Sequence, residues 1–237
     1  MPRTGPTPLR AARQALLRDA GVYLVTEESL SGGRSSVAVA RAALDAGVRV
    51  VQLREKEGSA RRALEIGLAL RAITAEHGAL LIVNDRVDIA IAIGADGVHV
   101  GQEDLPLEVA RSLAGPDALV GLSITAADQL RRPDAADADC LGVGAVFPTG
   151  SKADATDTGL DLLAAARRST AAPIVAIGGI TVANAGEAVR AGADVLAVIS
   201  AITLAADPGA AARALLDAVA EARAGAVSLP ADGSRDR

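Results

Sequence analysis

Aromatic side chains are almost absent from this chain of 237 residues, which has one Tyr, one Phe and no Trp. Since half of the residues are apolar, the core must be built from Ala, Val, Leu and Ile. A protein that binds nucleic acid typically combines a basic surface with interleaved aromatic residues. The scarcity of aromatics and the formal net charge of −5 therefore argue against a nucleic-acid partner.

Cysteine and long apolar runs are also scarce. The single cysteine, Cys140, excludes an intramolecular disulfide and any CxxC metal or redox site, and we interpret it as a small buried residue of a strand. No apolar run reaches the ~18 residues that a membrane span needs. Residues 1–20 lack the apolar stretch and cleavage site of a secretory signal. We therefore expect a cytoplasmic protein without a membrane partner.

Lysine is the third scarce residue. The chain has 24 basic residues, but only Lys56 and Lys152 are lysines. A lysine offers a compact charge on a flexible stem, which suits phosphate oxygens where the rigid fork of arginine does not fit. Our hypothesis is that both lysines hold a highly charged phosphate group. The alternative, that they are solvated loop charges, stays open from the sequence alone.

The fold is indicated by short β-branched runs that alternate with Ala/Leu/Arg-rich segments of helical period. Eight such strands are predicted, at residues 21–26, 48–54, 79–85, 97–100, 119–124, 140–147, 173–179 and 195–202. Near-continuous apolar strands favour a parallel sheet that is buried on both faces. The pattern predicts an α/β fold, a single-domain (β/α)8 TIM barrel. An open doubly wound sheet is the alternative, with two exposed edges.

The domain organisation follows from the same pattern. Residues 1–20 are expected to be an N-terminal helical extension, with a helix at roughly 8–19 that covers one end of the domain. Residues 21–225 are expected to form the catalytic barrel. Residues 226–237 have the composition of a disordered tail.

Polar residues gather where the predicted strands end. In (β/α)8 barrels the chemistry lies at the carboxyl ends of the strands, so these residues are expected to share one rim. Gln52, Arg54 and Lys56 occupy alternate positions, which directs their side chains to one side of an extended chain. The other residues expected at this rim are Asn84, Asp85, His99, Gln102, Asp104, Ser123, Thr149, Ser151, Lys152, Gly178, Gly179, Ile199 and Ser200.

Asp85 and Asp104 follow neighbouring predicted strands and suggest a metal site. One interpretation is that each caps the helix that follows it, at Arg86 and Pro106. Two carboxylates beside a bound phosphate would, however, repel it by several kcal/mol each at ~4 Å. Mg²⁺ prefers one or two carboxylates together with phosphate oxygens and water. A Mg²⁺–diphosphate site would therefore reconcile acids and bases at one rim.

Two further features are compatible either with ligand binding or with structure alone. Gly178 and Gly179 would leave backbone N–H groups uncovered for a second phosphate, although a tight turn also needs glycine. His99 would bind a substrate, act as an acid or base, or orient a neighbouring side chain.

Several segments together resemble the thiamine-phosphate synthase family. They are VQLREK, NDRVDIAIAIGADGVHVGQEDLP, GLS, LGVGAVFPTGSK, IVAIGGI and VISAI, which span roughly residues 21–215 in the family's order. The resemblance implies a (β/α)8 barrel enzyme. It implies that 4-amino-5-hydroxymethyl-2-methylpyrimidine diphosphate and a thiazole phosphate condense to thiamine phosphate and diphosphate, with Mg²⁺. The diphosphate would leave first, in a dissociative step.

The resemblance also assigns roles to residues. It implies that Asp85 and Asp104 bind Mg²⁺, and that Lys152, Lys56 and Arg54 are catalytic. The residues that it implies for the pyrimidine diphosphate are Gln52, Leu53, Arg54, Glu55, Lys56, Asn84, Ser123 and Lys152, with His99 in the same pocket. Those that it implies for the thiazole phosphate are Thr149, Gly150, Ser151, Gly179, Ile199 and Ser200.

The chain departs from the family at two positions. The usual TxTK is TGSK here, so that Gly150 loosens the loop, and Ala145 replaces a common Pro. These departures bear on the closure of the loop more than on the type of reaction. Two other functions stay open: a thiazole tautomerase that makes no new bond, and a non-catalytic barrel that senses thiamine precursors. An assembly of identical subunits is also compatible with the sequence.

Overall fold

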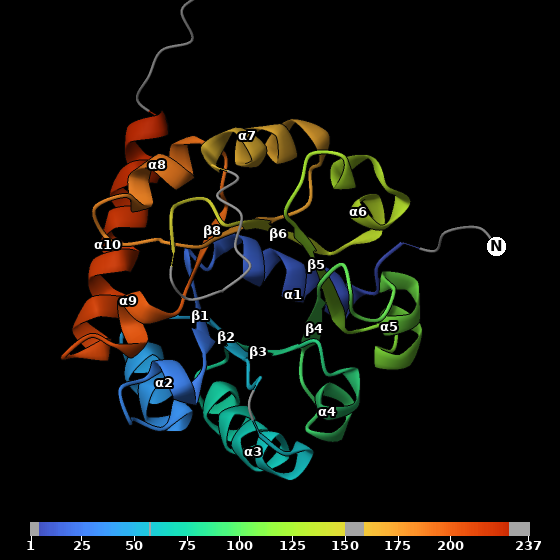
Figure 1. Cartoon of the computed structure of the whole chain (residues 1–237), viewed down its shortest axis with the longest axis vertical. Helices are drawn as coiled ribbons and strands as arrows, with labels where there is room; N and C mark the ends of the chain where they lie inside the picture. Colours follow the sequence, from blue (N-terminus) through green and yellow to red (C-terminus); the bar gives the residue numbers. More distant parts are fainter. Residues whose placement is uncertain (1–4, 57, 150–158, 228–237) are drawn as a thin grey trace, which may run out of the picture.

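The computed structural model describes residues 5–56, 58–149 and 159–227. Within them, eight parallel strands close into a barrel in chain order, and β1 pairs with β8 (Figure 1). The predicted (β/α)8 fold is therefore confirmed, and the open sheet is wrong. The strands are β1 (Val22–Thr26), β2 (Val50–Leu53), β3 (Leu80–Asn84), β4 (Gly97–Val100), β5 (Leu119–Ile124), β6 (Cys140–Gly144), β7 (Ile174–Ile177) and β8 (Val195–Val198).

Helices surround the barrel in a ring (Figure 1). The helices of this ring are α2 (Ser36–Asp45), α3 (Ala60–Glu76), α4 (Val87–Ala92), α5 (Leu107–Ala114), α6 (Pro133–Asp137), α7 (Gly159–Ser169), α8 (Ala185–Arg190) and α10 (Pro208–Val227). The short helix α9 (Ser200–Thr203) follows β8, and two 3₁₀ turns lie at Glu28–Leu30 and Gln129–Arg131. Because α10 extends to Val227, the chain is still helical where a tail was expected to begin, and residues 228–237 lie outside the described residues.

The strands are apolar on both faces because each face meets a different layer. One layer lies between the barrel and the helices and contains most of the buried Ala, Val, Leu and Ile. The other fills the barrel interior. Cys140 belongs to this interior layer and is 4% exposed, as predicted. The interior layer consists of Leu17, Ala20, Tyr23, Val25, Val50, Leu80, Ile82, Leu119, Cys140, Val175, Val195, Ala197 and Ile199.

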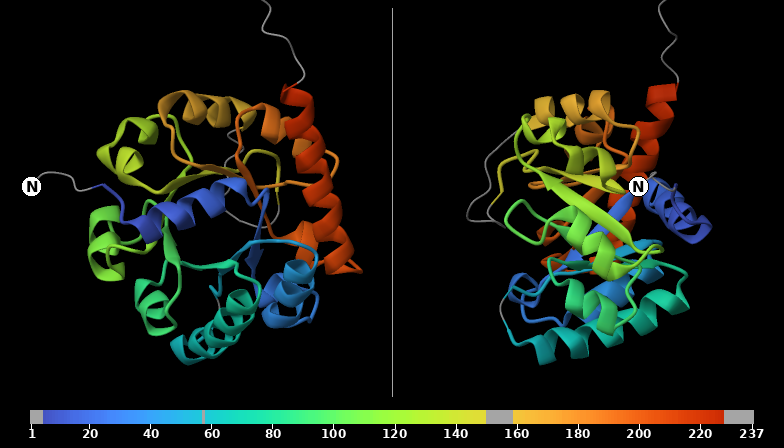
Figure 2. Two further views of the ribbon diagram at one scale, coloured as in Figure 1. Left: turned by 180° about the vertical axis from the view of Figure 1, so that it is seen from behind. Right: turned by 90° about the vertical axis from the view of Figure 1, so that its right-hand side faces the viewer.

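The amino-terminal end of the barrel is covered by α1 (Pro8–Asp19), which lies across it when the molecule is seen from behind (Figure 2). Thr7 caps this helix by accepting from the N–H of Arg10 at 3.2 Å, and Pro8 occupies the first turn, where no N–H is needed. Leu17 enters the interior layer with 1% exposure. The helix expected at 8–19 is therefore present and closes one end of the barrel.

Three aspartates secure the same end. Asp96, Asp139 and Asp194 each stand immediately before an even-numbered strand. Each accepts an N–H from the strand before it, at 2.8–2.9 Å, and pairs with an arginine of the helix that leads into that earlier strand, at 2.6–2.8 Å. The backbone donors are Leu81, Val120 and Ile174, and the arginines are Arg71, Arg111 and Arg167. We call Asp96, Asp139 and Asp194 the latch aspartates.

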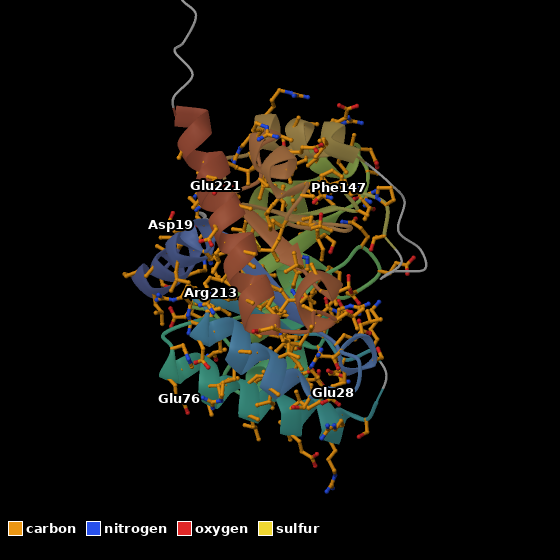
Figure 3. All side chains as sticks on the ribbon, turned by 90° about the vertical axis from the view of Figure 1, so that its left-hand side faces the viewer. Asp19, Glu28, Glu76, Phe147, Arg213 and Glu221 are labelled. Carbon is orange, nitrogen blue, oxygen red and sulfur yellow. The ribbon has the colours of Figure 1, made fainter. Side chains whose placement is uncertain are left out.

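Arginines of α1 extend these contacts across the end of the barrel. Arg13 Nη2 lies 2.8 Å from Asp96 Oδ1, and Arg10 Nε lies 3.2 Å from Asp139 Oδ1. Figure 3 shows Asp19, at the end of α1, on the side of the molecule opposite Glu28 and Phe147, which follow β1 and β6. The carboxyl ends of the strands are therefore free of α1. None of the helices in the described parts of the chain is long and apolar enough to cross a membrane.

Candidate active site

A pocket opens at the carboxyl ends of the strands. The empty space in the pocket, together with the open solvent at its mouth, is about 470 Å³. All eight strands or the residues directly after them contribute to its wall, so that side chains far apart in the sequence meet. Six of the predicted site residues are among those that line it, which are Tyr23, Val25, Gln52, Arg54, Asn84, His99, Ser123, Gly142, Val175, Ile177, Ala197 and Ile199.

The floor of the pocket holds a buried polar pair. Gln52 Nε2 donates to Tyr23 Oη at 2.8 Å, and Thr26 Oγ1 donates to the backbone oxygen of Gln52 at 3.0 Å. Tyr23 is 2% and Gln52 6% exposed. Burial raises the pKa of the Tyr23 phenol well above its usual value, so it stays neutral at physiological pH. The pair therefore presents a fixed, uncharged polar surface to a ligand.

His99 is packed over two glycines. A Cβ at Gly142 would lie 2.8 Å from its Cε1, and a Cβ at Gly121 would overlap its Nδ1, so both positions leave room for the imidazole. Its Nε2 lies 3.0 Å from Ser123 Oγ. The ring is therefore held in one orientation beside the serine, which is consistent with its expected role of orienting a neighbour and leaves its edge on the pocket wall.

The chain after β2 divides into inward and outward side chains. Arg54 lines the pocket and forms an ion pair with Glu27, which directly follows β1. Leu53 instead packs outward, where a Cβ on Gly67 of α3 would lie 3.1 Å from it. Lys56 is exposed at the rim.

Glu55 also turns away from the pocket. Its Oε1 accepts from Ser36 Oγ at 3.1 Å and from the N–H of Glu28 at 3.3 Å, and burial raises its pKa. Glu28 lies in the turn after β1, and Ser36 is the first residue of α2. The side chain of Leu53 therefore packs against α3, and that of Glu55 bonds to the turn after β1 and to the start of α2. Contacts of these two residues to a substrate would have to come from their backbone.

Asp85 and Asp104 meet at the rim. Asp85 has a left-handed backbone, with φ of 60°, a conformation that is uncommon outside glycine and often occurs at functional sites. Its own burial and the adjacent Asp104 raise the pKa of Asp85 to about 6, whereas Lys56 and Arg54 act to lower it. Asp104 Oδ2 accepts from the N–H of Gly101 at 2.7 Å. Two acids and two bases therefore share one rim.

The capping interpretation of the two aspartates is wrong. Helix α4 has Arg86 at its N-cap and α5 has Pro106 there, and neither cap makes a side-chain hydrogen bond. Neither carboxylate therefore caps the helix that follows it.

A tight double turn follows β7. Gly178 and Gly179 have φ of 103° and 64°, and a Cβ on Gly179 would lie 2.8 Å from Phe147 Cβ and would overlap Pro148 O. The segment after β6 bonds to this turn through Phe147 N, which lies 3.2 Å from Gly178 O. Both glycines are therefore required by the close approach of two loops, and Thr149 follows at the end of the described segment.

The remaining predicted residues near this turn are only partly described. Ile199 is 7% exposed, lines the pocket and is the N-cap of α9, and Ser200 is the exposed first residue of that helix. Gly150, Ser151 and Lys152 lie outside the described residues. The thiazole-phosphate assignments therefore stay predictions.

Comparison with known proteins decides the family. The profile described as thiamine monophosphate synthase matches residues 22–202, which contain all eight strands of the barrel. The chain belongs to the thiamine monophosphate synthase family. It is 51% identical over 207 residues to the thiamine-phosphate synthase of Natronomonas pharaonis, covering 86% of this chain and 97% of the relative. It is 49% identical over 203 residues to that of Moorella thermoacetica, covering 85% and 97%.

Solved structures agree. The thiamine phosphate pyrophosphorylase from Pyrococcus furiosus superposes with a TM-score of 0.80 at 40% identity, covering 87% of this chain and 98% of that one. A 3-hexulose-6-phosphate synthase, at 21% identity and a TM-score of 0.58, shares the fold alone. The chain is thus an enzyme of the thiamine monophosphate synthase family, a transferase family of thiamine biosynthesis that condenses a pyrimidine with a thiazole.

The carboxylate pair of this family member fits a magnesium ion. Burial and the neighbouring carboxylate of Asp104 raise the pKa of Asp85. A proton or a cation between the two carboxylates therefore stabilises them. No set of three or more His, Cys, Asp or Glu side chains that could hold a metal occurs in residues 5–56, 58–149 and 159–227. Two carboxylates suit Mg²⁺, which takes its other ligands from phosphate oxygens and water.

The pKa of Asp85 predicts how stability depends on pH without metal. An unfolded aspartate titrates near 3.9, and folded Asp85 near 6, so the folded protein binds more protons between pH 4 and 6. Stability is therefore expected to fall as the pH rises through this window. In EDTA at pH 7.5, D85N should be more stable than the native protein by about 1 kcal/mol, a figure reduced for partial exposure, and the difference should vanish at pH 4. Urea unfolding at both pH values measures it, and equal stability at pH 7.5 would contradict the prediction.

Glu27 is a charged residue beside the pocket that the sequence alone did not single out. It is a buried acid, 7% exposed, next to a pocket arginine. Its signal was present in the alternation of β1, because Tyr23 and Val25 face the pocket and Glu27 is the next residue of the same parity. An acidic residue two positions after the last pocket-facing residue of a strand therefore indicates a candidate site residue in a barrel of this family.

Proposed function

We propose that this enzyme joins 4-amino-5-hydroxymethyl-2-methylpyrimidine diphosphate to a thiazole phosphate, giving thiamine phosphate and diphosphate. The observation that carries the proposal is the mixed charge of one rim. There Asp104 raises the pKa of Asp85, and the cations Arg54 and Lys56 lower it. The cations would stabilise a trianionic leaving group, and the two acids beside it would hold a divalent ion. The apolar and amide part of the pocket suits a flat heterocycle.

The proposed reaction begins with loss of the diphosphate. The bond between the pyrimidine methylene carbon and the diphosphate oxygen breaks, and its electron pair leaves with the oxygen. The electron-rich aminopyrimidine stabilises the resulting cation. The lone pair of the thiazole nitrogen then forms the new C–N bond. No protein nucleophile is needed, and the role of the chain is to bind both reactants in line and to stabilise the departing charge.

The residues divide this work. Arg54 and Lys56, together with Lys152 from the undescribed segment, would stabilise the negative charge that develops on the diphosphate. Asp85 and Asp104 would hold Mg²⁺, which when bound neutralises part of that charge. Gln52, fixed by Tyr23, would bind the polar edge of the pyrimidine. Val25, Val175 and Ile177 on the wall would keep water from the cation.

A direct experiment tests the reaction. The purified protein is incubated with both precursors, with Mg²⁺ or with EDTA, and the products are identified by mass. Thiamine phosphate in the Mg²⁺ sample and its loss with EDTA are the expected results. Isomerisation of the thiazole phosphate without a new bond would favour a tautomerase. Binding of both compounds without turnover would favour a sensor.

Lys152 gives a sharper test of the leaving-group role. K152A should lower turnover about a hundredfold, because a cation that acts on developing charge contributes mainly in the transition state. Its affinity for thiazole phosphate should stay within about twofold, since the lysine serves the other reactant. Steady-state kinetics and titration calorimetry measure the two values. Turnover of K152A at the native rate would exclude the role.

A further inference from the structure

Glu27 and Arg54 are brought together by the register of the first two strands. In the parallel pairing of β1 with β2, Tyr23 lies opposite Val50 and Thr26 opposite Leu53. One further step along both strands places Glu27 opposite Arg54. The backbone continues this ladder, since the N–H of Arg54 donates to Thr26 O at 3.2 Å. The two residues are therefore neighbours by construction of the barrel, whatever a ligand does.

The pair is buried at the pocket. Glu27 is 7% and Arg54 6% exposed, and Arg54 lines the pocket wall. Burial lowers the pKa of Arg54, which reflects the cost of keeping a guanidinium away from water. A buried charge that loses its partner is strongly unfavourable. The carboxylate of Glu27 thus compensates a cation that the barrel has already placed beside the ligand space.

The ion pair still leaves Arg54 able to bind an anion. A guanidinium carries five N–H donors in a rigid planar fork, and Glu27 engages it through Nη1. When one nitrogen of such a fork is fixed, the direction of the other donors is fixed as well. Preorganised donors are the ones that contribute most to stabilising developing charge.

We infer that Glu27 is a positioning residue, which fixes the guanidinium of Arg54 for the diphosphate of the substrate. This inference rests on the proposed function for the identity of the anion. Glu27 itself need not touch either reactant. Its effect is expected to pass through Arg54, to concern the pyrimidine diphosphate, and to spare the thiazole phosphate.

The neighbouring Glu28 provides a matched control. It is also acidic and also pairs with an arginine, since Arg62 Nη2 lies 3.0 and 3.1 Å from its two carboxylate oxygens. That pair lies at the surface, with side-chain exposures of 29% and 51%, and it is not part of the pocket wall. E28Q therefore removes an acid and an ion pair one residue away without changing Arg54.

The test compares E27A, E27Q, R54M, the double variant E27A/R54M and E28Q. E27A should lower kcat/KM for the pyrimidine diphosphate about tenfold to a hundredfold, while KM for the thiazole phosphate changes less than about twofold. E27Q keeps an acceptor oxygen and should recover most of the loss. In the R54M background the further change to E27A should have an effect below about twofold. E28Q should resemble the native enzyme.

Binding of inorganic diphosphate separates this inference from the proposed function. Calorimetry with diphosphate at constant Mg²⁺ should show the same order, with E27A and R54M weakened and E28Q unchanged. If the native protein forms no thiamine phosphate but this order holds, the reaction is wrong and the positioning role stands. The role is overturned if E27A binds diphosphate like the native protein, if no variant binds it, or if E27A and R54M act additively. Thermal unfolding confirms that each variant is folded.

Discussion

The variant D85N/D104N is expected to turn over the pyrimidine diphosphate about a thousandfold more slowly than the native enzyme, because a bound metal contributes several kcal/mol to stabilising a charged transition state. Asparagine keeps the shape of each side chain, and its Oδ1 can still accept from the N–H of Gly101. What is lost is the pair of negative charges that meet at the rim. The structure thus predicts loss of chemistry without loss of fold.

Three measurements make this prediction strict. Turnover should no longer respond to added Mg²⁺, calorimetric Mg²⁺ binding should disappear, and the urea midpoint in EDTA should not decrease. The control is D88N on α4. Asp88 is exposed, its Oδ2 lies 2.6 Å from Arg86 Nη2, and neither residue lines the pocket. Native turnover by the double variant would rule out a role for these carboxylates.

The second large effect is expected at the other end of the barrel. D139A should destabilise the protein by about 3–5 kcal/mol, since it leaves two partly buried arginines without their carboxylate partner and a buried N–H without an acceptor. Asp139 is 4% exposed, accepts from Val120 N at 2.8 Å, and pairs with Arg111 at 2.7 Å and with Arg10 of α1 at 3.2 Å. The midpoint of thermal unfolding should fall by about 10 °C.

The same variant should keep its activity. Asp139 precedes β6 at the amino-terminal end, whereas the pocket lies at the carboxyl ends, so kcat at 20 °C should stay within about twofold of the native value. D134A serves as the control, because Asp134 is an exposed residue in the first turn of α6. A midpoint for D139A within about 2 °C of the native one would contradict the latch role.

Much of this architecture is predictable because it follows from periodicity. Alternating strand and helix patterns predicted the barrel, and the rule that carboxyl ends of parallel strands share a rim predicted that Asp85 and Asp104 would meet. The roles of individual residues within the pocket remain predictions for the experiments above. Strand ends were predicted less well, since β6 stops at Gly144 although the apolar run continues to Phe147. Apolar residues after a strand look the same in sequence whether they pair or pack in a loop.

Two features needed the register of the strands. Arg54 looked like a free cation of the QLREK segment, and only the pairing of β1 with β2 reveals Glu27 beside it. Similarly, Glu55 stands between two cations in sequence, yet it turns to Ser36. The latch aspartates resemble ordinary loop acids, because their donors lie 15 to 20 positions earlier in the chain. Contacts across such separations are set by tertiary geometry and leave no local pattern.

The placement of the three latch aspartates has a consequence for evolution and design. Each latch aspartate joins two successive strands at their amino-terminal ends. The loops at the carboxyl ends can therefore lengthen, shorten or change composition without weakening the barrel. Selection can then act on substrate choice and on durability through separate sets of positions. Transplanting rim loops from a relative with another substrate should accordingly succeed more often in this barrel than exchanging the segments that precede its even-numbered strands.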